Sequence, residues 1–456
     1  MLSIIMCLLS SVVAVDFISV MVTVSCLIPL SFGMMYKTTN YAEEWLWCIN
    51  QMNGWLSFLT LTILLLVAIS TVQMSAYYFS LHLLLCVVVM AAFGSSNFLS
   101  FYVLFESSLI PILLMILSWG YQPERLQAGM YMIMYTVLGS MPLLAALLYM
   151  AWSTSYMSFY WLINFYDGGY YNAFMLLGML AFLVKLPAYP FHAWLPKAHV
   201  EAPLGGSMVL AGVLLKLGGY GLYLYHLIIP MPLCFMPVAV VISSSMWGGL
   251  VAAFVCLFQS DIKSMIAYSS VVHMSIVIVG ILSGTSWGFS AALITMLSHG
   301  WASSALFLAA YTTYKKTGSR SFLYTKGLLS IYPPLSLFWF LLCSLNMSIP
   351  PTINFMGELL AIVASKLVSW VILLLMVLIM FISVAYNMYM YSKVNHGCSS
   401  AYINSSKQLS AVELLSLLTH CCPLALLFCV DMMCLYTVVC IMNSYTIFGL
   451  QNQCFK

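Results

Sequence analysis

The chain has 456 residues, of which 64% are hydrophobic and only 5% are charged, and its formal net charge is +3. Because a soluble protein carries roughly 25% charged residues, this composition excludes an ordinary water-exposed surface and predicts a polytopic membrane protein. The small net charge gives no reason to expect nucleic acid or an acidic ligand as a partner.

The N-terminus shows no recognisable targeting signal. Residues 1–16 contain no basic segment and no Arg-rich amphipathic pattern, so they resemble neither a secretory signal nor an organelle transit peptide. We therefore expect a chain made either in a bacterium or inside the organelle that uses it. The 33 methionines beside only two arginines favour a mitochondrially encoded protein.

Apolar runs near the ~20 residues that a bilayer requires follow one another along the chain. Residues 2–35 are expected to form one long or two short spans interrupted by Asp16, and a polar loop follows from Lys37 to Asn53. Further runs centre near residues 63, 86, 107, 139, 182, 216, 245, 273, 300, 337, 360, 380 and 430. We expect thirteen or fourteen transmembrane helices in one membrane domain covering residues 1–456.

The polar segments between these runs are too short for a soluble domain. They include residues 120–125, 197–201, 315–326 and 393–407. Ser410 to Glu413 has the spacing of a capping box, which predicts a helix start there. Asp261 has the position of an N-cap for the run that follows it.

Two of the apolar runs carry a lysine near the middle, Lys185 and Lys216. A lysine at that depth costs ~2.5–3.5 kcal/mol on insertion scales, so it normally faces a partner or water inside the bundle. The first run is also interrupted, because Pro187 and Pro190 lack the N–H groups that would satisfy the carbonyls of the preceding turn. A buried amine beside a broken helix is typical of an ion or proton pathway.

Other titratable residues lie in the middle of apolar runs, one in each of several predicted helices. With the two lysines, the candidate site residues are Glu106, Lys185, Lys216, His273, His299 and Glu358. An ion pair that only stabilises the bundle is one interpretation, and for the histidines a satisfied core position or a haem ligand is another. Unpaired, several such groups would cost ~10 kcal/mol or more. Their distribution over separate helices favours a relay, in which imidazole can pass protons near neutral pH.

A weak internal symmetry supports transport. The first half has a polar helix at Glu106 and a broken helix at Lys185, while the second half has His273 followed by a break at Pro350 and Pro351 before Glu358. Interrupted helices at corresponding places in two halves are the best indication of a transporter's binding site.

The sequence predicts no redox centre and no bound cofactor in this chain. There is no Gly-rich dinucleotide turn, and the 14 cysteines lack the spacing of a metal or iron–sulfur site.

Long motifs resemble the antiporter-like membrane subunits of respiratory complex I. These are LVKLPAYPFHAWLPKAHVEAPLGGSMVLAGVLLKLGGYG (183–221), SDIKSMIAYSSVVHMS (260–275) and MLSHGWASSALF (296–307). Within that family, GYQPERLQAGMYMIMYT (120–136) and NMSIPPTINFMGELL (346–360) resemble the subunit 4 branch of the mitochondrially encoded NADH–ubiquinone oxidoreductase. The resemblance is strong over residues 95–392, whereas both ends match only in hydrophobicity.

The resemblance implies about fourteen helices with two inverted five-helix repeats and two Pro-broken helices. The expected parts are N-terminal helices at 1–94, a first repeat at 95–229, a second repeat at 231–392 and a C-terminal helix region at 393–456. The family often has a basic residue three positions after the GGYG motif, where this chain has Leu224, so a role for that cation is in doubt.

The resemblance also implies a function, proton translocation coupled to electron transfer elsewhere in complex I. Glu106 and Lys185 would form a controlling pair, Lys216, His273 and His299 a hydrated path, and Glu358 its far end. A charge from a neighbouring antiporter-like subunit would pull Glu106 away, so that Lys185 releases its proton towards Lys216. NADH, FMN, iron–sulfur clusters and ubiquinone would belong to other subunits, and lipid of the mitochondrial inner membrane would surround this chain.

Three rival hypotheses remain. A stand-alone or Mrp-type cation/proton antiporter would share the fold and the lysines. A purely structural membrane arm would use the buried charges only to fix helix packing. A haem or quinone protein is the third.

Overall fold

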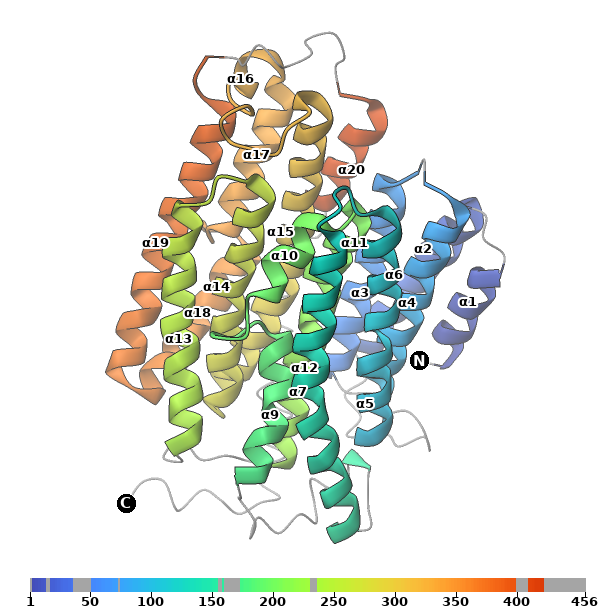
Figure 1. Ribbon diagram of the computed structural model, residues 1–456, viewed down its shortest axis with the longest axis vertical. Helices are drawn as coiled ribbons and strands as arrows, with labels where there is room; N and C mark the ends of the chain where they lie inside the picture. Colours follow the sequence, from blue (N-terminus) through green and yellow to red (C-terminus); the bar gives the residue numbers. More distant parts are fainter. Residues whose placement is uncertain are drawn as a thin grey trace.

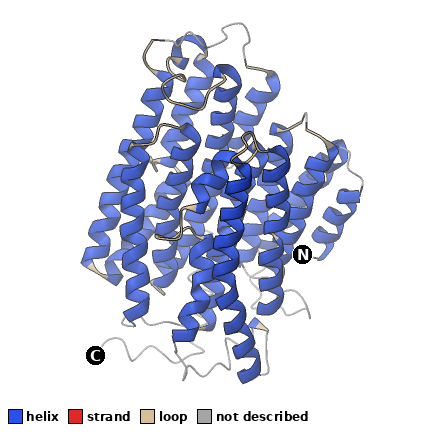
Figure 2. Ribbon diagram, in the orientation of Figure 1, coloured by secondary structure: helices blue, strands red, loops and turns tan. Residues whose placement is uncertain are grey.

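The computed structural model describes residues 2–13, 17–35, 51–72, 74–154, 158–159, 173–229, 236–398 and 409–421. Within these ranges the chain is helical and has no β-strand, only the isolated bridges Asn97–Ser158 and Asp261–Ser321 (Figure 2). The predicted all-α class is therefore confirmed for this part of the chain. Asp16, most of the loop from Lys37 and the run near residue 430 lie outside the described residues.

The helices follow in chain order, with one π-helical turn labelled η1. They are α1 (Leu2–Val13), α2 (Phe17–Met35), α3 (Gln51–Ser70), α4 (Ala76–Gly94), α5 (Phe98–Ser107), α6 (Leu109–Trp119), α7 (Arg125–Thr154), α9 (Ala173–Lys185), α10 (Trp194–Glu201), α11 (Leu204–Val209), η1 (Leu210–Leu214), α12 (Leu215–Ile228), α13 (Met236–Leu257), α14 (Ile262–Leu282), α15 (Ser286–Thr317), α16 (Leu328–Ile331), α17 (Pro333–Asn346), α18 (Ile353–Val368), α19 (Trp370–Asn395) and α20 (Ala411–Cys421). Nine segments of the described chain are long and apolar enough to cross a membrane.

Most of the long helices run roughly parallel to the long axis of the molecule (Figure 1). The N-terminal helices α1, α2 and α4 lie at one side of the bundle and α13 and α19 at the other, with α7, α9, α10 and α12 between them. The 32-residue helix α15 lies at the centre, because it packs against α3, α11, η1, α14, α17, α18 and α20. An apolar stretch of 18 residues in α15 is completely buried.

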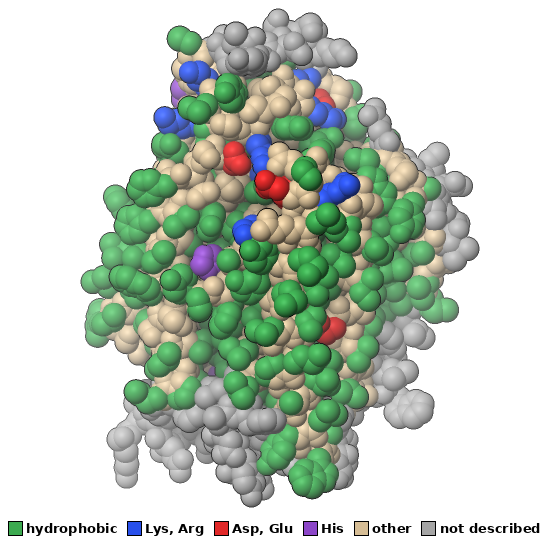
Figure 3. Space-filling model, viewed as in Figure 1, with side chains coloured by type: hydrophobic (Ala, Val, Ile, Leu, Met, Phe, Trp, Pro, Cys, Tyr) green, Lys and Arg blue, Asp and Glu red, His purple; other side chains and the backbone are tan. Residues whose placement is uncertain are grey.

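The outer helices present apolar side chains to the surroundings. In α7 and in α19, only 39% of an apolar stretch of 18 residues is buried. The exposed residues of these helices include Leu138 and Phe381. The surface seen in Figure 3 is largely hydrophobic, and its charged side chains gather mainly toward one end of the bundle. This distribution is expected of a protein surrounded by lipid, since charged groups belong near the water interface.

The first interrupted helix is observed where the prolines predicted it. Helix α9 ends at Lys185, residues 186–193 form turns, and α10 begins at Trp194. The carbonyl of Leu183 accepts a hydrogen bond from the Ala188 N–H at 2.9 Å, and the Val184 carbonyl accepts one from the Trp194 indole at 3.0 Å. Protein groups therefore satisfy these carbonyls at the break, as membrane depth requires.

The second interruption separates α17 from α18 at residues 347–352. The Asn354 side-chain amide donates to Ser348 Oγ at 2.8 Å and to the carbonyls of Leu345 and Asn346 at 3.4 and 3.5 Å. One side chain thus holds the end of α17 near the start of α18.

The two predicted helix starts differ in detail. The Ser410 N–H donates to Glu413 Oε2 at 3.1 Å and the Glu413 N–H donates to Ser410 Oγ at 3.3 Å, so the capping box is confirmed. Asp261 does precede α14, but its side chain makes no capping bond and instead lies 3.4 Å from Arg320 Nε. The Asp261 carboxylate therefore forms an ion pair with Arg320 instead of capping α14.

Candidate functional site

Four of the six predicted residues form a continuous row through the buried interior. Lys216 of α12 is fully buried, and its amine lies 3.0 Å from Nδ1 of His299 in α15. The rings of His299 and His273, the latter in α14, have centroids 5.2 Å apart. Nδ1 of His273 lies 3.6 Å from Oε1 of Glu358 in α18.

The backbone around Lys216 is shaped to receive its amine. The amine donates to the carbonyl of Ala211, which belongs to the π-helical turn η1. A π-turn displaces carbonyls from the α-helical pattern and is frequent at functional sites. Since an ammonium group only donates, His299 Nδ1 accepts from Lys216 when the amine is charged, which leaves the ring proton of neutral His299 on Nε2.

The approach of α18 to α15 depends on a glycine beside Glu358. A Cβ atom on Gly357 would lie 2.7 Å from Cγ2 of Thr295, well inside van der Waals contact. Only glycine lets the two helices lie this close, and this contact brings the Glu358 carboxylate to His273. Glu358 is 2% exposed.

Several nitrogens in this row have no hydrogen-bond partner among the described residues. They are both ring nitrogens of His273 and Nε2 of His299. Buried polar atoms are normally paired with protein or water. Nearby side chains or buried water are therefore needed to satisfy these nitrogens.

Glu106 and Lys185 lie together but do not form a close ion pair. The Lys185 amine donates to the carbonyl of Phe105 at 2.7 Å and lies 3.4 Å from the centre of the Phe105 ring. No Lys185–Glu106 contact within 4.0 Å is present among the described residues, and Oε1 of the partly exposed Glu106 has no hydrogen-bond partner there. The amine thus bonds to the residue next to the expected acid.

An apolar gap separates Lys185 from Lys216. Helices α9 and α12 are in contact, since the position of a Cβ on Gly218 would be 3.1 Å from Cβ of Lys185. A cavity of about 10 Å³ beside Lys185 is lined largely by leucines, including Leu214 and Leu215. That volume is near the minimum for one water molecule. The six residues therefore fall into two groups, Glu106 with Lys185 and the row from Lys216 to Glu358.

The sequence-based prediction missed buried polar residues in α10. We expected residues 197–201 to form a polar loop, but they are helical, and His199 and Glu201 are 0% and 3% exposed. The His199 ring stacks on Phe307 with centroids 4.8 Å apart, and both its nitrogens lack a hydrogen-bond partner among the described residues. The local polarity of LPKAHVE hid its burial, because only the packing of α10 against α7 and α14 shows that this segment lies inside the bundle.

A second polar network surrounds the break before Glu358 and was also missed. Ser298 donates to Asn354 Oδ1 at 2.9 Å, and the Asn346 amide donates to Asn387 Oδ1 at 2.9 Å. These neutral side chains carry no charge signal in the sequence. In the part of the chain that the structure describes, no group of three or more His, Cys, Asp or Glu residues is placed to hold a metal ion.

Comparison with known proteins gives consistent matches. The family described as NADH:quinone oxidoreductase/Mrp antiporter, TM, matches residues 95–383, which include all six candidate residues. The protein of Albinaria caerulea named NADH-ubiquinone oxidoreductase chain 4 is 47% identical over 407 residues, covering 88% of this chain and 93% of its own length. The protein of the same name from Ceratitis capitata is 43% identical over 359 residues, covering 78% of this chain and 79% of its own.

Two solved structures share the fold at low sequence identity. A chain of respiratory complex I from Thermus thermophilus with bound NADH has a TM-score of 0.88 at 21% identity, covering 98% of this chain and all of that chain. A chain of the Mrp complex from Dietzia sp. DQ12-45-1b has a TM-score of 0.87 at 16% identity, covering 98% and 97%. At such identities the likeness describes the fold alone.

Proposed function

The chain belongs to the family of NADH-ubiquinone oxidoreductase chain 4, and from this membership we propose how its buried side chains move protons. It is an antiporter-like subunit of the proton-translocating NADH-ubiquinone oxidoreductase, complex I. In our proposal protons pass from the Glu106–Lys185 group to Lys216, then through His299 and His273 to Glu358. The observation that carries this proposal is the continuous row of four titratable side chains from four different helices.

Charge repulsion limits how many protons the row holds. Two positive charges 3.0 Å apart, the separation of the Lys216 amine and His299 Nδ1, repel by ~5 kcal/mol at an effective dielectric constant of ~20. Lys216 and His299 therefore do not both carry a positive charge readily. A proton that arrives at one of them favours release by the other, which is the exchange that a relay needs.

The acid at the end of the row favours movement in one direction. A protonated His273 is attracted by the Glu358 carboxylate at 3.6 Å, whereas a protonated His299 faces the Lys216 amine. A positive charge in the row is thus drawn away from Lys216 and towards Glu358. Coupling begins when a charge in a neighbouring antiporter-like subunit changes the distance between Glu106 and Lys185.

Proton transfer between the two groups requires a change at the apolar gap. The leucines beside Lys185 belong partly to η1, the same turn whose Ala211 carbonyl accepts from Lys216. Movement of this turn would therefore widen the small cavity and, at the same time, shift the Lys216 amine. We propose that η1 gates transfer between Lys185 and Lys216.

We propose further that the chain has about fourteen helices, with inverted repeats at 95–229 and 231–392. Each proposed repeat contains one interrupted helix, formed by α9 and α10 in the first and by α17 and α18 in the second. The site lies where they meet the central helices, as in transporters built from repeats. Terminal helices at 1–94 and 393–456 complete the single membrane domain.

We propose that the chain lies in the mitochondrial inner membrane, and its animal relatives named NADH-ubiquinone oxidoreductase chain 4 support this. Other membrane subunits of complex I, including neighbouring antiporter-like ones, are its partners. NADH, FMN, the iron–sulfur clusters and ubiquinone act in other subunits, and this chain contributes no redox centre. An Mrp-type antiporter shares the fold, but relatives more than 40% identical over most of the chain favour complex I.

Proton pumping by the assembled enzyme tests the controlling pair. We expect Lys185→Ala and Glu106→Gln each to lower the number of protons moved per NADH oxidised, measured in vesicles with the assembled complex. An unchanged stoichiometry in both variants, with normal assembly on native gels, would eliminate the pair. Sodium-dependent proton exchange by the isolated chain would instead favour an antiporter.

A further inference from the structure

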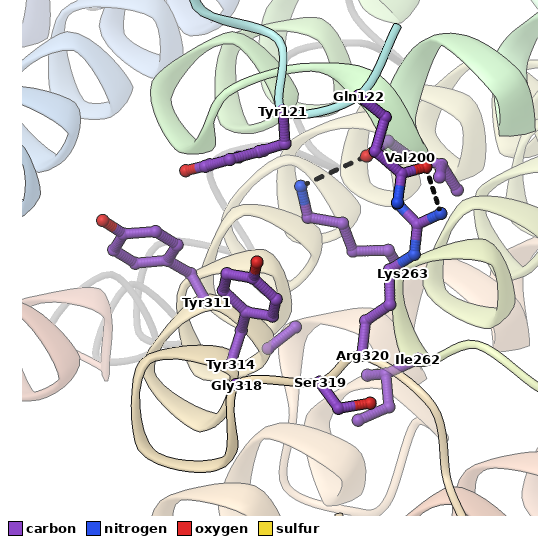
Figure 4. A pocket seen from close by; sticks show the side chains of 11 residues that line it. Tyr121, Gln122, Val200, Ile262, Lys263, Tyr311, Tyr314, Gly318, Ser319 and Arg320 are labelled. Atoms are coloured by element: carbon purple, nitrogen blue, oxygen red, sulfur yellow. Dashed lines mark hydrogen bonds between the residues drawn. The ribbon is translucent and has the colours of Figure 1, made fainter. Parts of the chain in front are cut away.

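A cavity of about 380 Å³ is lined by none of the residues of the row (Figure 4). It is formed by the loop between α6 and α7, the end of α10, the start of α14 and the end of α15 with the loop that follows. Its volume lies in the range of small-molecule sites, roughly 300–1,000 Å³. The lining residues are Tyr121, Gln122, Val200, Ile262, Lys263, Ala310, Tyr311, Tyr314, Gly318, Ser319 and Arg320.

The charged side chains on the wall of this cavity are both positive. Lys263 is only 8% exposed, and its amine donates to the Ala202 carbonyl at 3.1 Å. Arg320 is fixed from behind by Glu201 and Asp261, each at 3.4 Å. Neither of these acids is among the described residues that line the cavity. The acids hold Arg320 in place while the wall itself presents two cations.

Hydroxyl groups complete the lining. Tyr121, Tyr311 and Tyr314 lie to one side of the Lys263 amine, with Arg320 on the other (Figure 4). The rings of Tyr121 and Tyr314 have centroids 6.0 Å apart, and the Lys263 amine lies 5.3 Å from the centre of the Tyr121 ring. Burial raises the pKa of the Tyr121 phenol, which therefore stays a neutral hydrogen-bond donor.

We propose that this cavity binds a phosphate group, supplied either by a phospholipid headgroup or by a soluble phosphate. Lysine, arginine and hydroxyl donors arranged around one space are the groups that bind phosphate oxygens by charge-assisted hydrogen bonds. Glu201 and Asp261 offset the charge of Arg320, so the Lys263 amine and the tyrosine hydroxyls supply the main contacts for an anion. The cavity lies where several helices end, and helix ends in a membrane protein are the level at which headgroup phosphates meet water.

Tyrosine nitration in the purified, delipidated complex tests this binding. Tyr314 is 37% exposed and lines the cavity, whereas Tyr189 is 42% exposed and lies elsewhere, so it serves as the reference. The complex is nitrated with tetranitromethane at constant ionic strength, and modified peptides are quantified by mass spectrometry. The probes are dihexanoylphosphatidylglycerol below its micelle concentration, inorganic phosphate, and dihexanoylglycerol as the analogue without phosphate.

We expect a phosphate-bearing probe to slow nitration of Tyr314 at least about threefold and to leave Tyr189 unchanged. Protection by the phospholipid alone assigns the site to a headgroup, and equal protection by inorganic phosphate assigns it to a soluble ligand. If neither protects Tyr314, or if dihexanoylglycerol protects it equally well, the proposal is overturned.

Matched variants connect the protection to the cavity. Lys263→Gln should raise the probe concentration for half-protection about tenfold or more, because it removes a charge-assisted hydrogen bond. Lys197→Gln removes an exposed cation of α10 that lies over Tyr131, outside the cavity, and should leave it unchanged. Should Lys263→Gln fail to assemble, Tyr311→Phe serves instead, with about threefold weakening expected. Undiminished protection in the variant that assembles would contradict the proposal.

Discussion

His273 of α14 and Glu358 of α18 face each other, with Nδ1 of the histidine 3.6 Å from Oε1 of the acid. The two side chains are 1% and 3% exposed. This pair ends the row that begins at Lys216. Its separation is slightly longer than a hydrogen bond, so a small movement of α18 makes or breaks it.

Glu358→Gln should strongly impair proton transfer through this subunit. The amide keeps the shape of the side chain but neither attracts a protonated His273 nor accepts its proton, so we expect at least about a tenfold slower transfer. The measurement is the rate of vesicle acidification, compared with the rate of NADH oxidation recorded in the same sample.

Glu413→Gln is the matched control for that variant. Glu413 caps α20 and contacts Lys315 at 3.3 Å, and it lies outside the row. We expect normal pumping and a loss of stability of about 1 kcal/mol or less. Equal pumping defects in the two variants would mean that any lost carboxylate disturbs the bundle, and the role of Glu358 would have to be withdrawn.

His299→Gln separates proton exchange from hydrogen bonding. Glutamine can still accept a hydrogen bond from Lys216, but it does not titrate, so pumping should fall while assembly is retained. His226→Gln is the matched control. His226 is a buried histidine near the C-terminal end of α12, whereas Lys216 lies near its start, and Nε2 of His226 lies near Gly284, outside the row. Pumping by this second variant should stay normal, and a defect of similar size there would contradict the specific role of His299.

Much of the candidate site could be predicted from sequence because charge in an apolar run is a strong signal. Lys185, Lys216 and Glu358 stand out for this reason, and the prolines beside two of them indicate interrupted helices. The contacts among the site residues could not be predicted, since they depend on how α12, α14, α15 and α18 pack against one another. His199 and Asn354 were missed because the first lies in a locally polar segment and the second is neutral.

Gly357→Ala should destabilise the protein by about 1–3 kcal/mol, the usual cost of overpacking a core. The added methyl group would meet Cγ2 of Thr295 at 2.7 Å and push α18 away from α15. We expect a lower midpoint of thermal unfolding of the assembled complex and weaker pumping. Thr295→Ser removes Cγ2, so the double variant should recover part of both losses, and the absence of any recovery would contradict this packing role.

Asn354→Leu should weaken the connection between α17 and α18. The substitution keeps a similar volume but removes the bonds to Ser348 Oγ and Ser298 Oγ, leaving buried polar groups unpaired. Such groups cost about 1–3 kcal/mol each. Limited proteolysis in detergent should then cut near residues 347–352 faster than in the parent protein. An unchanged cleavage rate would show that the break is held by other contacts.

The stoichiometry of proton pumping in Lys216→Met tests the relay most directly. Methionine fills nearly the same space without a charge or a donor, so the row loses its first member while the packing is kept. We predict fewer protons moved per NADH oxidised, in fully assembled complex with its electron transfer measured alongside. Normal assembly with an unchanged proton-to-electron ratio would contradict the claim that these buried groups carry protons.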